Sequence, residues 1–339
     1  MINGHGDDIH QYDAIRINFS SNVYNHFDHE RLFCHLADQL DHVSNYPEPA
    51  PFGLEQSMAP MLGLQADQLM VTNGATEAIY LIAQTFRRKR SAIITPTFSE
   101  YADACRVHEH QLSNIYSLSQ LHGGFDIVWL CNPNNPTGSV IDKDELIACI
   151  AAHPDTLFVV DASYARFTER PVITPSEAIR HPNLLMLHSL TKEYSIPGLR
   201  IGYVTGNASL LDDLRRQRMP WSVNQVAIDA AHYLLAHPDD YAFNLHALMS
   251  ERERVSQLLS AIGGVTVWPS DTHILLCQLT IGKASALKEY LAHEHGILIR
   301  DASNFAGLGP NFFRIAVQTP EEDDELIEAM KQWCWNIIV

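Results

Sequence analysis

The sequence contains few basic residues, and this shortage argues against negatively charged polymers as binding partners. Its 339 residues include 23 Lys and Arg but 40 Asp and Glu, which gives a formal net charge of −17. The one dense basic run, residues 87–90 (RRKR), follows a helical pattern, where the helix dipole and water stabilise cations. Because no basic run is long enough to follow a phosphate backbone, nucleic acid is not an expected partner.

Paired cysteines, metal-ligand motifs and membrane-length apolar stretches are also absent. None of the six cysteines forms a Cys-x-x-Cys pair, and none of the 18 histidines belongs to a His-Glu-x-x-His motif. We therefore expect no disulfide framework and no metal. No apolar stretch approaches the about 20 residues that span a bilayer, and no basic segment followed by an apolar run opens the chain. We expect a cytoplasmic protein that does not bind membranes.

Apolar runs rich in β-branched residues alternate with helical patterns through the middle of the chain. Strands are predicted at residues 92–95, 127–131, 157–161, 184–188 and 201–205. Helices are predicted at residues 76–88, 99–108 and 143–152, the last with Asp142 as its N-cap. Such alternation is typical of an α/β fold with a mostly parallel sheet covered by helices.

The pattern changes after residue 205. Helices are predicted at residues 224–236, 240–262, 284–295 and 320–335, and shorter strands at residues 265–268, 274–278, 297–299 and 312–317. The first sixty residues have a proline-rich window and are interpreted as an arm and a loop. We expect an N-terminal arm and small-domain segment at residues 1–50, a large cofactor-binding domain at 51–235 and a small α+β C-terminal domain at 236–339.

One lysine stands in a segment that otherwise has the pattern of a strand end and a turn. The segment is SLTKEYSIPGLR (residues 189–200), and the lysine is Lys192. Burial and neighbouring cations can lower a lysine pKa far below about 10.4, which makes the amine a nucleophile. A Schiff base with pyridoxal phosphate (PLP) uses such an amine. This cofactor also needs an acid at its ring nitrogen, donors for its phosphate and a flat partner for its ring.

The chain offers an acid and an anion site in suitable places. Asp161 ends the predicted strand LFVVD, and the carboxyl ends of parallel strands open into the ligand crevice. Its carboxylate would hold the ring nitrogen as a pyridinium. Gly74 stands at a turn directly before a helix, so the N–H groups of Ala75 and Thr76 and the helix dipole would bind the phosphate.

Further polar residues surround these two sites. Ser189 and Thr191 can donate hydroxyl groups to the phosphate, and Arg200 can donate its guanidinium fork. Within CNPNNPTGSV (residues 131–140), Asn135 would reach the phenolate oxygen of the cofactor ring. The remaining expected contacts are Tyr164 at the same oxygen and Tyr101 against the ring face.

Each of these residues has an ordinary structural alternative. Asp161 alone could cap a turn, Gly74 alone could end a helix, and Lys192 alone could be a surface charge. The ordered set carries the interpretation, because Lys192 follows Asp161 by 31 residues (192 − 161) and Arg200 follows Lys192 by eight (200 − 192).

With these motifs, the chain resembles the fold-type I PLP-dependent enzymes of the class I/II aminotransferase superfamily over nearly its whole length. It is similar to histidinol-phosphate aminotransferases and to the threonine-phosphate decarboxylases of cobalamin biosynthesis. The resemblance implies a mostly parallel central sheet of the seven-stranded type, PLP as cofactor and Lys192 as the Schiff-base lysine. It also implies a homodimer with shared active sites, in which Tyr46 in SNYPEP reaches the cofactor phosphate of the neighbouring subunit.

The resemblance also assigns residues to the substrate, a small phosphorylated amino acid. Arg314 in FFRIAV matches the arginine that binds the α-carboxylate, and Asn22 in FSSNVYN matches a second carboxylate contact. A substrate phosphate would need its own donors. Arg300 is favoured, since it ends a predicted strand, whereas His5 and Arg16 could equally be solvated surface residues. Asn224 is a further candidate, and Trp221 could close the pocket or be an ordinary core aromatic.

The sequence leaves two reactions open. Decarboxylation and transamination differ in which bond at Cα lies perpendicular to the conjugated plane, and residue identity does not fix that angle. The segments at residues 219–224 (MPWSVN) and 297–308 (ILIRDASNFAGL) are similar to those of the decarboxylases. They favour decarboxylation of O-phospho-L-threonine to (R)-1-amino-2-propanol phosphate. GATEA departs from the decarboxylase pattern GETES, which keeps histidinol-phosphate transamination with 2-oxoglutarate as the alternative.

Two non-enzymatic classes are disfavoured. A transcription regulator built on this domain should carry a winged-helix region ahead of it, and here the motifs begin almost immediately. A binding module without activity should have lost Lys192 or Asp161, and both are present.

Overall fold

The computed structural model describes residues 7–338, with side chains up to Trp335. Among these residues, the largest sheet has seven strands in the order β2-β8-β7-β6-β5-β3-β4. β8 is antiparallel to both its neighbours, and the other neighbouring pairs are parallel, which confirms the mostly parallel central sheet. The strands are β2 (Leu69–Thr72), β3 (Arg90–Ile94), β4 (Gln111–Ile115), β5 (Ile127–Cys131), β6 (Leu157–Asp161), β7 (Leu184–Ser189) and β8 (Gly202–Gly206).

Helices cover both faces of this sheet, so its central strands are continuous apolar runs. Alternate side chains of one strand point to opposite faces: Trp129 of β5 packs into one core cluster and Val128 into another. The cluster of Trp129 includes residues of α3 (Gly74–Thr85), α4 (Glu100–Val107) and α8 (Ala208–Arg215). The cluster of Val128 includes residues of α5 (Lys143–Ala152) and α6 (Pro175–Ala178). The predicted cap is confirmed, because the Asp142 side chain accepts from Asp144 N and Glu145 N.

A smaller antiparallel sheet follows in the chain. Its strand order is β12-β13-β10-β9, and three long helices pack against it and one another. Leu259, Leu291 and Met330 of these helices share one core cluster with Trp129, so the apolar core continues between the two sheets. The elements are α10 (Leu245–Ser260), β9 (Val265–Val267), β10 (Ile274–Leu279), α11 (Ala284–His295), β12 (Arg300–Asp301), β13 (Phe312–Ala316) and α12 (Pro320–Ile338).

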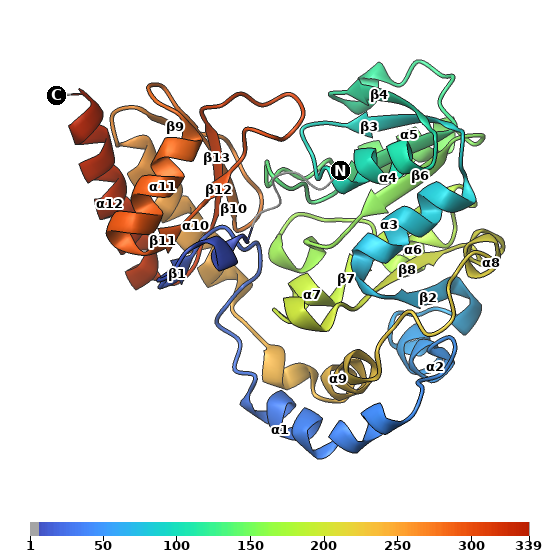
Figure 1. Ribbon diagram of the computed structural model, residues 1–339. Coiled ribbons are helices and arrows are strands. Elements are labelled where there is room, and N and C mark those ends of the chain that lie inside the picture. Colours follow the sequence, from blue (N-terminus) through green and yellow to red (C-terminus); the bar gives the residue numbers. More distant parts are fainter. Residues whose placement is uncertain (1–6, 339) are drawn as a thin grey trace.

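The chain crosses between the two parts in two places, before α1 and between α9 and α10 (Figure 1). The N-terminal segment lies beside the small part at β1 (Ile17–Asn18), which pairs in parallel with β11 (Ile297–Leu298). It then runs to α1 (Glu30–Asp38) and α2 (Phe52–Met61) on the large part, which pack against α9 (Gln225–Ala236). Both parts therefore contribute to what lies between them.

The structure differs from the sequence-based prediction mainly near the N-terminus and at the sheet edge. The arm and loop expected in the first sixty residues contain the helices α1 and α2. β4 was not predicted, because it is an edge strand whose side chains are mostly exposed and polar. The long helix predicted from residue 240 begins at Leu245, where the Asn244 side chain caps α10 by accepting from Ala247 N at 3.0 Å.

Candidate active site

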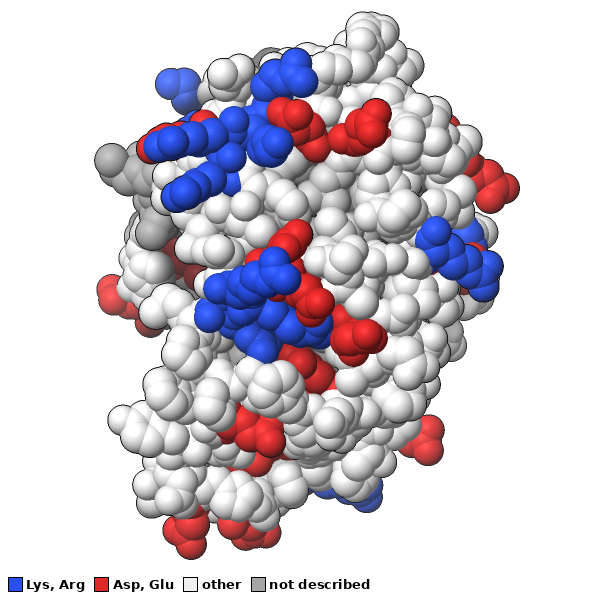
Figure 2. All heavy atoms as spheres, turned by 90° about the vertical axis from the view of Figure 1, so that its right-hand side faces the viewer, with Lys and Arg blue, Asp and Glu red and all other residues white. Residues whose placement is uncertain are grey.

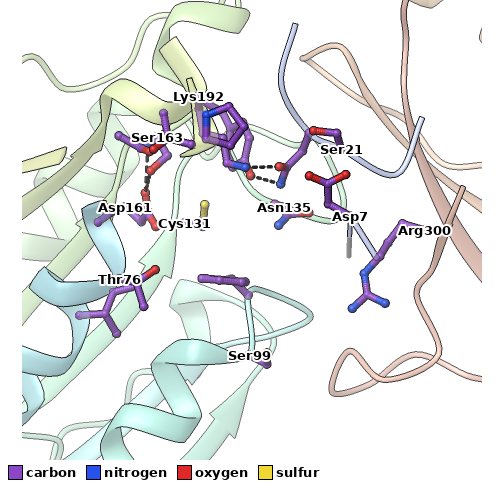
Figure 3. Close-up of a pocket in the computed structure, with 18 of the residues that line it drawn as sticks. Asp7, Ser21, Thr76, Ser99, Cys131, Asn135, Asp161, Ser163, Lys192 and Arg300 are labelled. Atoms are coloured by element: carbon purple, nitrogen blue, oxygen red, sulfur yellow. Dashed lines mark hydrogen bonds between the residues drawn. The ribbon is translucent and has the colours of Figure 1, made fainter. Parts of the chain in front are cut away.

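A cavity opens where the carboxyl ends of β5, β6 and β7 meet residues of the small antiparallel sheet. In Figure 3, Asp161 and Ser163 lie on one side of it, Asp7 and Arg300 lie on the other, and Lys192 points in between them. The cavity collects most of the predicted site residues: Asn22, Ala75, Thr76, Tyr101, Asn135, Asp161, Tyr164, Ser189, Thr191, Lys192, Arg200, Arg300 and Arg314.

Lys192 lies on α7 (Leu190–Glu193), the short helix that directly follows β7. Its Nζ donates a hydrogen bond to Oδ1 of Asn22. Burial lowers the pKa of this amine to about 8, and the Arg314 cation acts in the same direction. A lysine with this pKa is partly neutral near pH 8, as a nucleophilic amine must be.

Asp161 is the last residue of β6 and is buried. Its Oδ1 accepts from Ser163 N at 2.9 Å and from Ser163 Oγ at 2.5 Å, and its Oδ2 accepts from the Tyr101 hydroxyl at 2.7 Å. Burial raises the pKa of the Asp161 carboxyl, and the donors from Ser163 and Tyr101 oppose that rise by stabilising the charged form. The ring of Tyr101 lies nearly parallel to that of Trp129, with centroids 6.0 Å apart.

The start of α3 forms an anion-binding corner of the cavity. Gly74 has φ +72°, and a Cβ at this position would lie 2.8 Å from Nη2 of Arg200. Ala75 and Thr76 line the cavity at the start of α3, and no side-chain hydrogen bond caps this helix. The buried Oγ1 of Thr191 has no hydrogen-bond partner among the described residues. A phosphate at this corner would satisfy these donors.

Asn22, Tyr164 and Lys192 form a continuous polar network. Nδ2 of Asn22 donates to the Tyr164 hydroxyl, while Oδ1 of the same amide accepts from Lys192. Burial raises the pKa of Tyr164, so its hydroxyl stays protonated. Asn22 is predicted to bind the substrate carboxylate, and in the structure it also contacts the amine of Lys192.

Arg314 is buried, and its guanidinium faces the cavity. Nη1 donates to Oδ1 of Asn135 at 2.8 Å, and Nη2 donates to the carbonyl of Ser20. Its Nε is buried without a partner, and no acidic side chain of the described residues lies within ion-pair distance. Burial lowers the pKa of Arg314 to about 10, because it removes the charged guanidinium from water, and the Arg300 cation acts in the same direction.

Arg300 stands directly opposite Arg314 in the antiparallel pair of β12 and β13. Nη1 of Arg300 donates to the carbonyl of Asp301 at 2.6 Å, and Nη2 donates to Oδ1 of Asn304 at 2.8 Å. The guanidinium also lies 5.2 Å from the centre of the Phe305 ring. Like charges directly opposite on neighbouring strands repel each other. Two buried arginines in this register therefore favour an anionic ligand.

Several predicted residues lie away from the cavity. Tyr46 is 85% exposed, and its ring centre is 5.4 Å from that of Trp221, which is also outside the cavity lining. Arg16 is exposed and pairs with Glu325 at 2.6 Å, so within one chain it is a solvated surface residue. Asn224 caps α9 by accepting from Ala227 N. These side chains do not meet Lys192 within one copy of the chain.

The structure also shows cavity residues that the sequence analysis missed. Ser163, Cys131, Asp7 and Ser20 all line the cavity. The position of Ser163, two residues after a buried strand-end aspartate, was a usable indication, since such residues commonly hydrogen-bond to the aspartate side chain. The predicted His5 lies outside the described residues.

Two other kinds of feature are absent from the described residues 7–338. These residues contain no group of three or more side chains placed to hold a metal ion, and no helix that is both long and apolar enough to cross a membrane. Figure 2 shows the Lys and Arg side chains of one face in small groups with Asp and Glu beside them. Within the basic run, Arg88 pairs with Glu109 at 2.7 Å and Arg90 with Asp126 at 3.4 Å.

The fold and the cavity together define a fold-type I PLP-dependent enzyme. Residues 14–330 match the family model of the class I and II aminotransferases, and the chain belongs to this family. Its cofactor is pyridoxal 5′-phosphate, and the residues present fit it. Thr191 Oγ1 and the uncapped start of α3 would receive the phosphate, Asp161 would face the ring nitrogen, and Lys192 would face the aldehyde.

Two relatives with different activities are similar to the chain to the same degree. Threonine-phosphate decarboxylase of Salmonella typhimurium is 30% identical over 312 residues, covering 87% of this chain and 85% of the relative. Histidinol-phosphate aminotransferase of Brevibacillus brevis is 29% identical over 315 residues, covering 88% and 84%. Overall identity to these relatives therefore does not separate the two reactions.

Solved structures show the same fold. L-threonine-O-3-phosphate decarboxylase from Porphyromonas gingivalis has a TM-score of 0.90 and 38% identity, covering 94% of this chain and 99% of that one. Histidinol-phosphate aminotransferase from Sinorhizobium meliloti, in complex with pyridoxal-5′-phosphate, has a TM-score of 0.87 and 20% identity, covering 99% and 95%. The second likeness concerns the fold alone.

Proposed function

We propose that the protein decarboxylates O-phospho-L-threonine to (R)-1-amino-2-propanol phosphate, the reaction that serves cobalamin biosynthesis in the decarboxylases it resembles. The opposed pair Arg300 and Arg314 carries the proposal, because this substrate has two anionic groups, a carboxylate and a phosphate. The 38% identity to the decarboxylase of known structure supports the same choice. The substrate carboxylate and phosphate would each bind to one of these two buried guanidinium groups.

We assign the cofactor contacts as follows. Lys192 would bond to the cofactor aldehyde, Asp161 would hold the ring nitrogen protonated, and Asn135 and Tyr164 would bind the phenolate oxygen. Tyr101 lies against the ring, although its hydroxyl already donates to Asp161. The start of α3, at Gly74, Ala75 and Thr76, would bind the cofactor phosphate through main-chain N–H groups. The other phosphate contacts would be the side chains of Ser189, Thr191, Arg200 and Tyr46 of the partner subunit.

PLP, when bound, withdraws electrons from the substrate Cα, and the protein decides which bond breaks. Arg314 would hold the carboxylate in a fixed direction, since its own position is set by Asn135 and the Ser20 carbonyl. Asn22 would be the second carboxylate contact, and Arg300 would take the phosphate, with His5 as a further donor. Lys192 shares one hydrogen-bonded network with Asn22 and Tyr164, and its amine would move a proton within that network.

We further propose a homodimer that shares its active sites. Tyr46 is exposed within one chain, and its ring lies beside that of Trp221, which is also exposed. Phe33 and Val43, which precede Tyr46 in the chain, are exposed as well. Exposed apolar side chains that gather on a surface are typical of a protein interaction site. Sedimentation of the purified protein should show a dimer, and an active monomer would contradict this assignment. Tyr46→Phe should weaken cofactor binding without dissociating the dimer.

The alternative is histidinol-phosphate transamination. It is favoured by the 29% identity to the Brevibacillus brevis aminotransferase and by the departure of the segment at residues 74–78 (GATEA) from the decarboxylase pattern. Two arginines would also suit 2-oxoglutarate, which carries two carboxylates.

One assay with two substrates separates these functions. The purified protein with PLP is given O-phospho-L-threonine, and CO₂ and aminopropanol phosphate are measured. It is then given histidinol phosphate and 2-oxoglutarate, and glutamate is measured. Release of CO₂ without glutamate supports the decarboxylase, and glutamate without CO₂ overturns it. Lys192→Ala is the control, since it should be inactive in both arms.

A further inference from the structure

Arg166 lies outside the cavity lining but contacts the segment that carries Lys192. It belongs to the short helix η5 (Ala165–Phe167), two residues after Tyr164. Its Nη1 donates to the main-chain carbonyl of Glu193 at 2.8 Å, and Glu193 directly follows the lysine. Its Nη2 donates to the carbonyl of Tyr241. One guanidinium thus joins the lysine-bearing turn to a distant part of the chain.

Three aromatic rings hold this guanidinium in place. Its Cζ lies 5.4 Å from the ring centre of Phe27, 5.3 Å from Tyr194 and 5.0 Å from Phe243. Such cation–π contacts strengthen when the cation is shielded from water, and the Arg166 side chain is only partly exposed. The cation also lowers the pKa of the partly buried Glu193 carboxyl, which desolvation itself raises.

The elements that meet at Arg166 are those at which the chain crosses between the two sheets. Phe27 belongs to the segment before α1, Tyr241 is the last residue of η7 (Pro238–Tyr241), and Phe243 lies between η7 and α10. Figure 1 shows both crossings, which are the connections between the large and the small part. The α7 turn is tied to the first crossing independently, because Ser195 Oγ donates to the Tyr24 carbonyl.

We propose that Arg166 is a positioning residue for Lys192. It fixes the α7 turn through the Glu193 carbonyl and links that turn to both crossings, so that the amine of the large part keeps its place relative to the arginines of the small part. This inference rests on the proposed role of Lys192 and on neither of the two reactions.

The first test measures the amine itself, in protein freed of cofactor. Lys192 is labelled by a limiting amount of acetic anhydride at a series of pH values, and its midpoint is compared with that of a surface lysine. The charged groups that act on the amine are Arg314, Arg200, Asp7 and Asp161, and none is changed. Arg166→Met should loosen the turn, admit water to the amine and move its midpoint upward from about 8.

The second test is kinetic, with whichever substrate the wild-type protein converts. A small displacement of a reacting group costs up to about 10²-fold, so Arg166→Met should lower kcat by roughly 10- to 100-fold while KM changes little. Arg166→Lys keeps the cation among the rings and should restore part of kcat. Arg166→Gln, which can donate to one carbonyl, replaces the methionine variant if that variant does not fold.

A matched control separates positioning from a general loss of stability. Arg215 also donates to main-chain carbonyls, those of Ala66, Asp67 and Leu69, and lies outside the cavity lining. Arg215→Met should lower the melting temperature without moving the Lys192 midpoint. Wild-type kcat and midpoint in a folded Arg166→Met or Arg166→Gln protein would overturn the proposal. Equal effects in the Arg166 and Arg215 variants would also overturn it. Full activity of Lys192→Ala would instead refute the proposed function.

Discussion

The two walls of the cavity are built in different ways. On the large-sheet wall, Asn135, Asp161 and Lys192 lie at or just beyond the carboxyl ends of three neighbouring parallel strands, and each has polar partners in the protein. On the small-sheet wall, Arg300 and Arg314 face each other across one antiparallel pair. The first wall carries side chains of different chemical types, whereas the second places two buried arginines opposite each other. We therefore propose that the large sheet carries the reactive groups and that the small sheet carries the groups that recognise the substrate.

The largest expected effect is on the large-sheet wall. Lys192→Ala should remove the absorbance band of the lysine–cofactor bond near the visible edge and lower kcat by at least about 10⁴-fold, since proton transfer alone contributes about 10²–10⁴. Absorbance spectra and borohydride trapping measure the first effect and steady-state rates the second. Lys331→Ala, which removes an exposed amine paired only with Glu328, is the control. An unchanged trapped adduct in Lys192→Ala would break the assignment of reactivity to this wall.

The next effect tests the recognition wall and its influence across the cavity. Arg314→Met should cost about 2–5 kcal/mol in kcat/KM, as for other buried charge partners, and Arg300→Met less, about 1.5–3 kcal/mol. The double variant measures how far the two cations act on one substrate. Equal losses in both single variants would contradict the distinct roles that we give to carboxylate and phosphate.

The Arg314 variant should also move a pKa on the opposite wall. The Arg314 cation lowers the pKa of Lys192, which is about 8, so its removal should raise that pKa. The amine is unreactive while protonated, and the labelling curve of Lys192 in cofactor-free protein should therefore move to higher pH in Arg314→Met. A labelling curve that stays in place or moves to lower pH would show that the Arg314 cation does not lower the pKa of Lys192 across the cavity.

The sequence predicts the large-sheet wall better than the small-sheet wall, for a physical reason. The predicted strands at residues 127–131 and 157–161 coincide with β5 and β6, because strands buried on both faces are continuous apolar runs. The residues that follow them must then meet at one sheet edge. The opposition of Arg300 and Arg314 depends on strand register, which tertiary packing sets and spacing alone does not show.

Other features depended on contacts between distant segments and could not be predicted. Asn22 was expected at the substrate carboxylate, but its amide also bridges Lys192 and Tyr164. The hydrogen bond from Arg166 to the Tyr241 carbonyl joins residues that are 75 positions apart in the chain (241 − 166). Tyr46 cannot meet the cavity within a single chain, so its predicted role depends on the proposed dimer.

A smaller effect concerns the anion-binding corner of the large-sheet wall. Gly74→Ala places a Cβ in the left-handed region and 2.8 Å from Arg200 Nη2, and the backbone strain alone costs roughly 1–2 kcal/mol. Cofactor affinity should fall about 5- to 30-fold, measured by titrating cofactor-free protein with PLP and following absorbance. Gly263→Ala, where nothing lies within 4 Å of the added Cβ, should bind as the wild type does. Unchanged affinity in Gly74→Ala would place the phosphate elsewhere.

The smallest expected effect tests whether the Tyr101 hydroxyl lowers the pKa of Asp161 or whether Tyr101 only packs against the large-sheet wall. Tyr101→Phe removes one of the donors to Asp161 but leaves both bonds from Ser163, so the loss should be about 1 kcal/mol, or roughly fivefold in kcat/KM. Since the Tyr101 donor lowers the pKa of Asp161, its removal should raise that pKa. The ionised carboxylate is then lost at a higher pH as pH falls, and the acid limb of the rate profile moves to higher pH. Tyr80→Phe is the matched control, because Tyr80 donates to the buried carboxylate of Glu100 at 2.8 Å but lies outside the cavity lining. An acid limb that moves equally in both variants would mean that Tyr101 acts through packing, and that the reactivity of this wall does not depend on the proton affinity of Asp161.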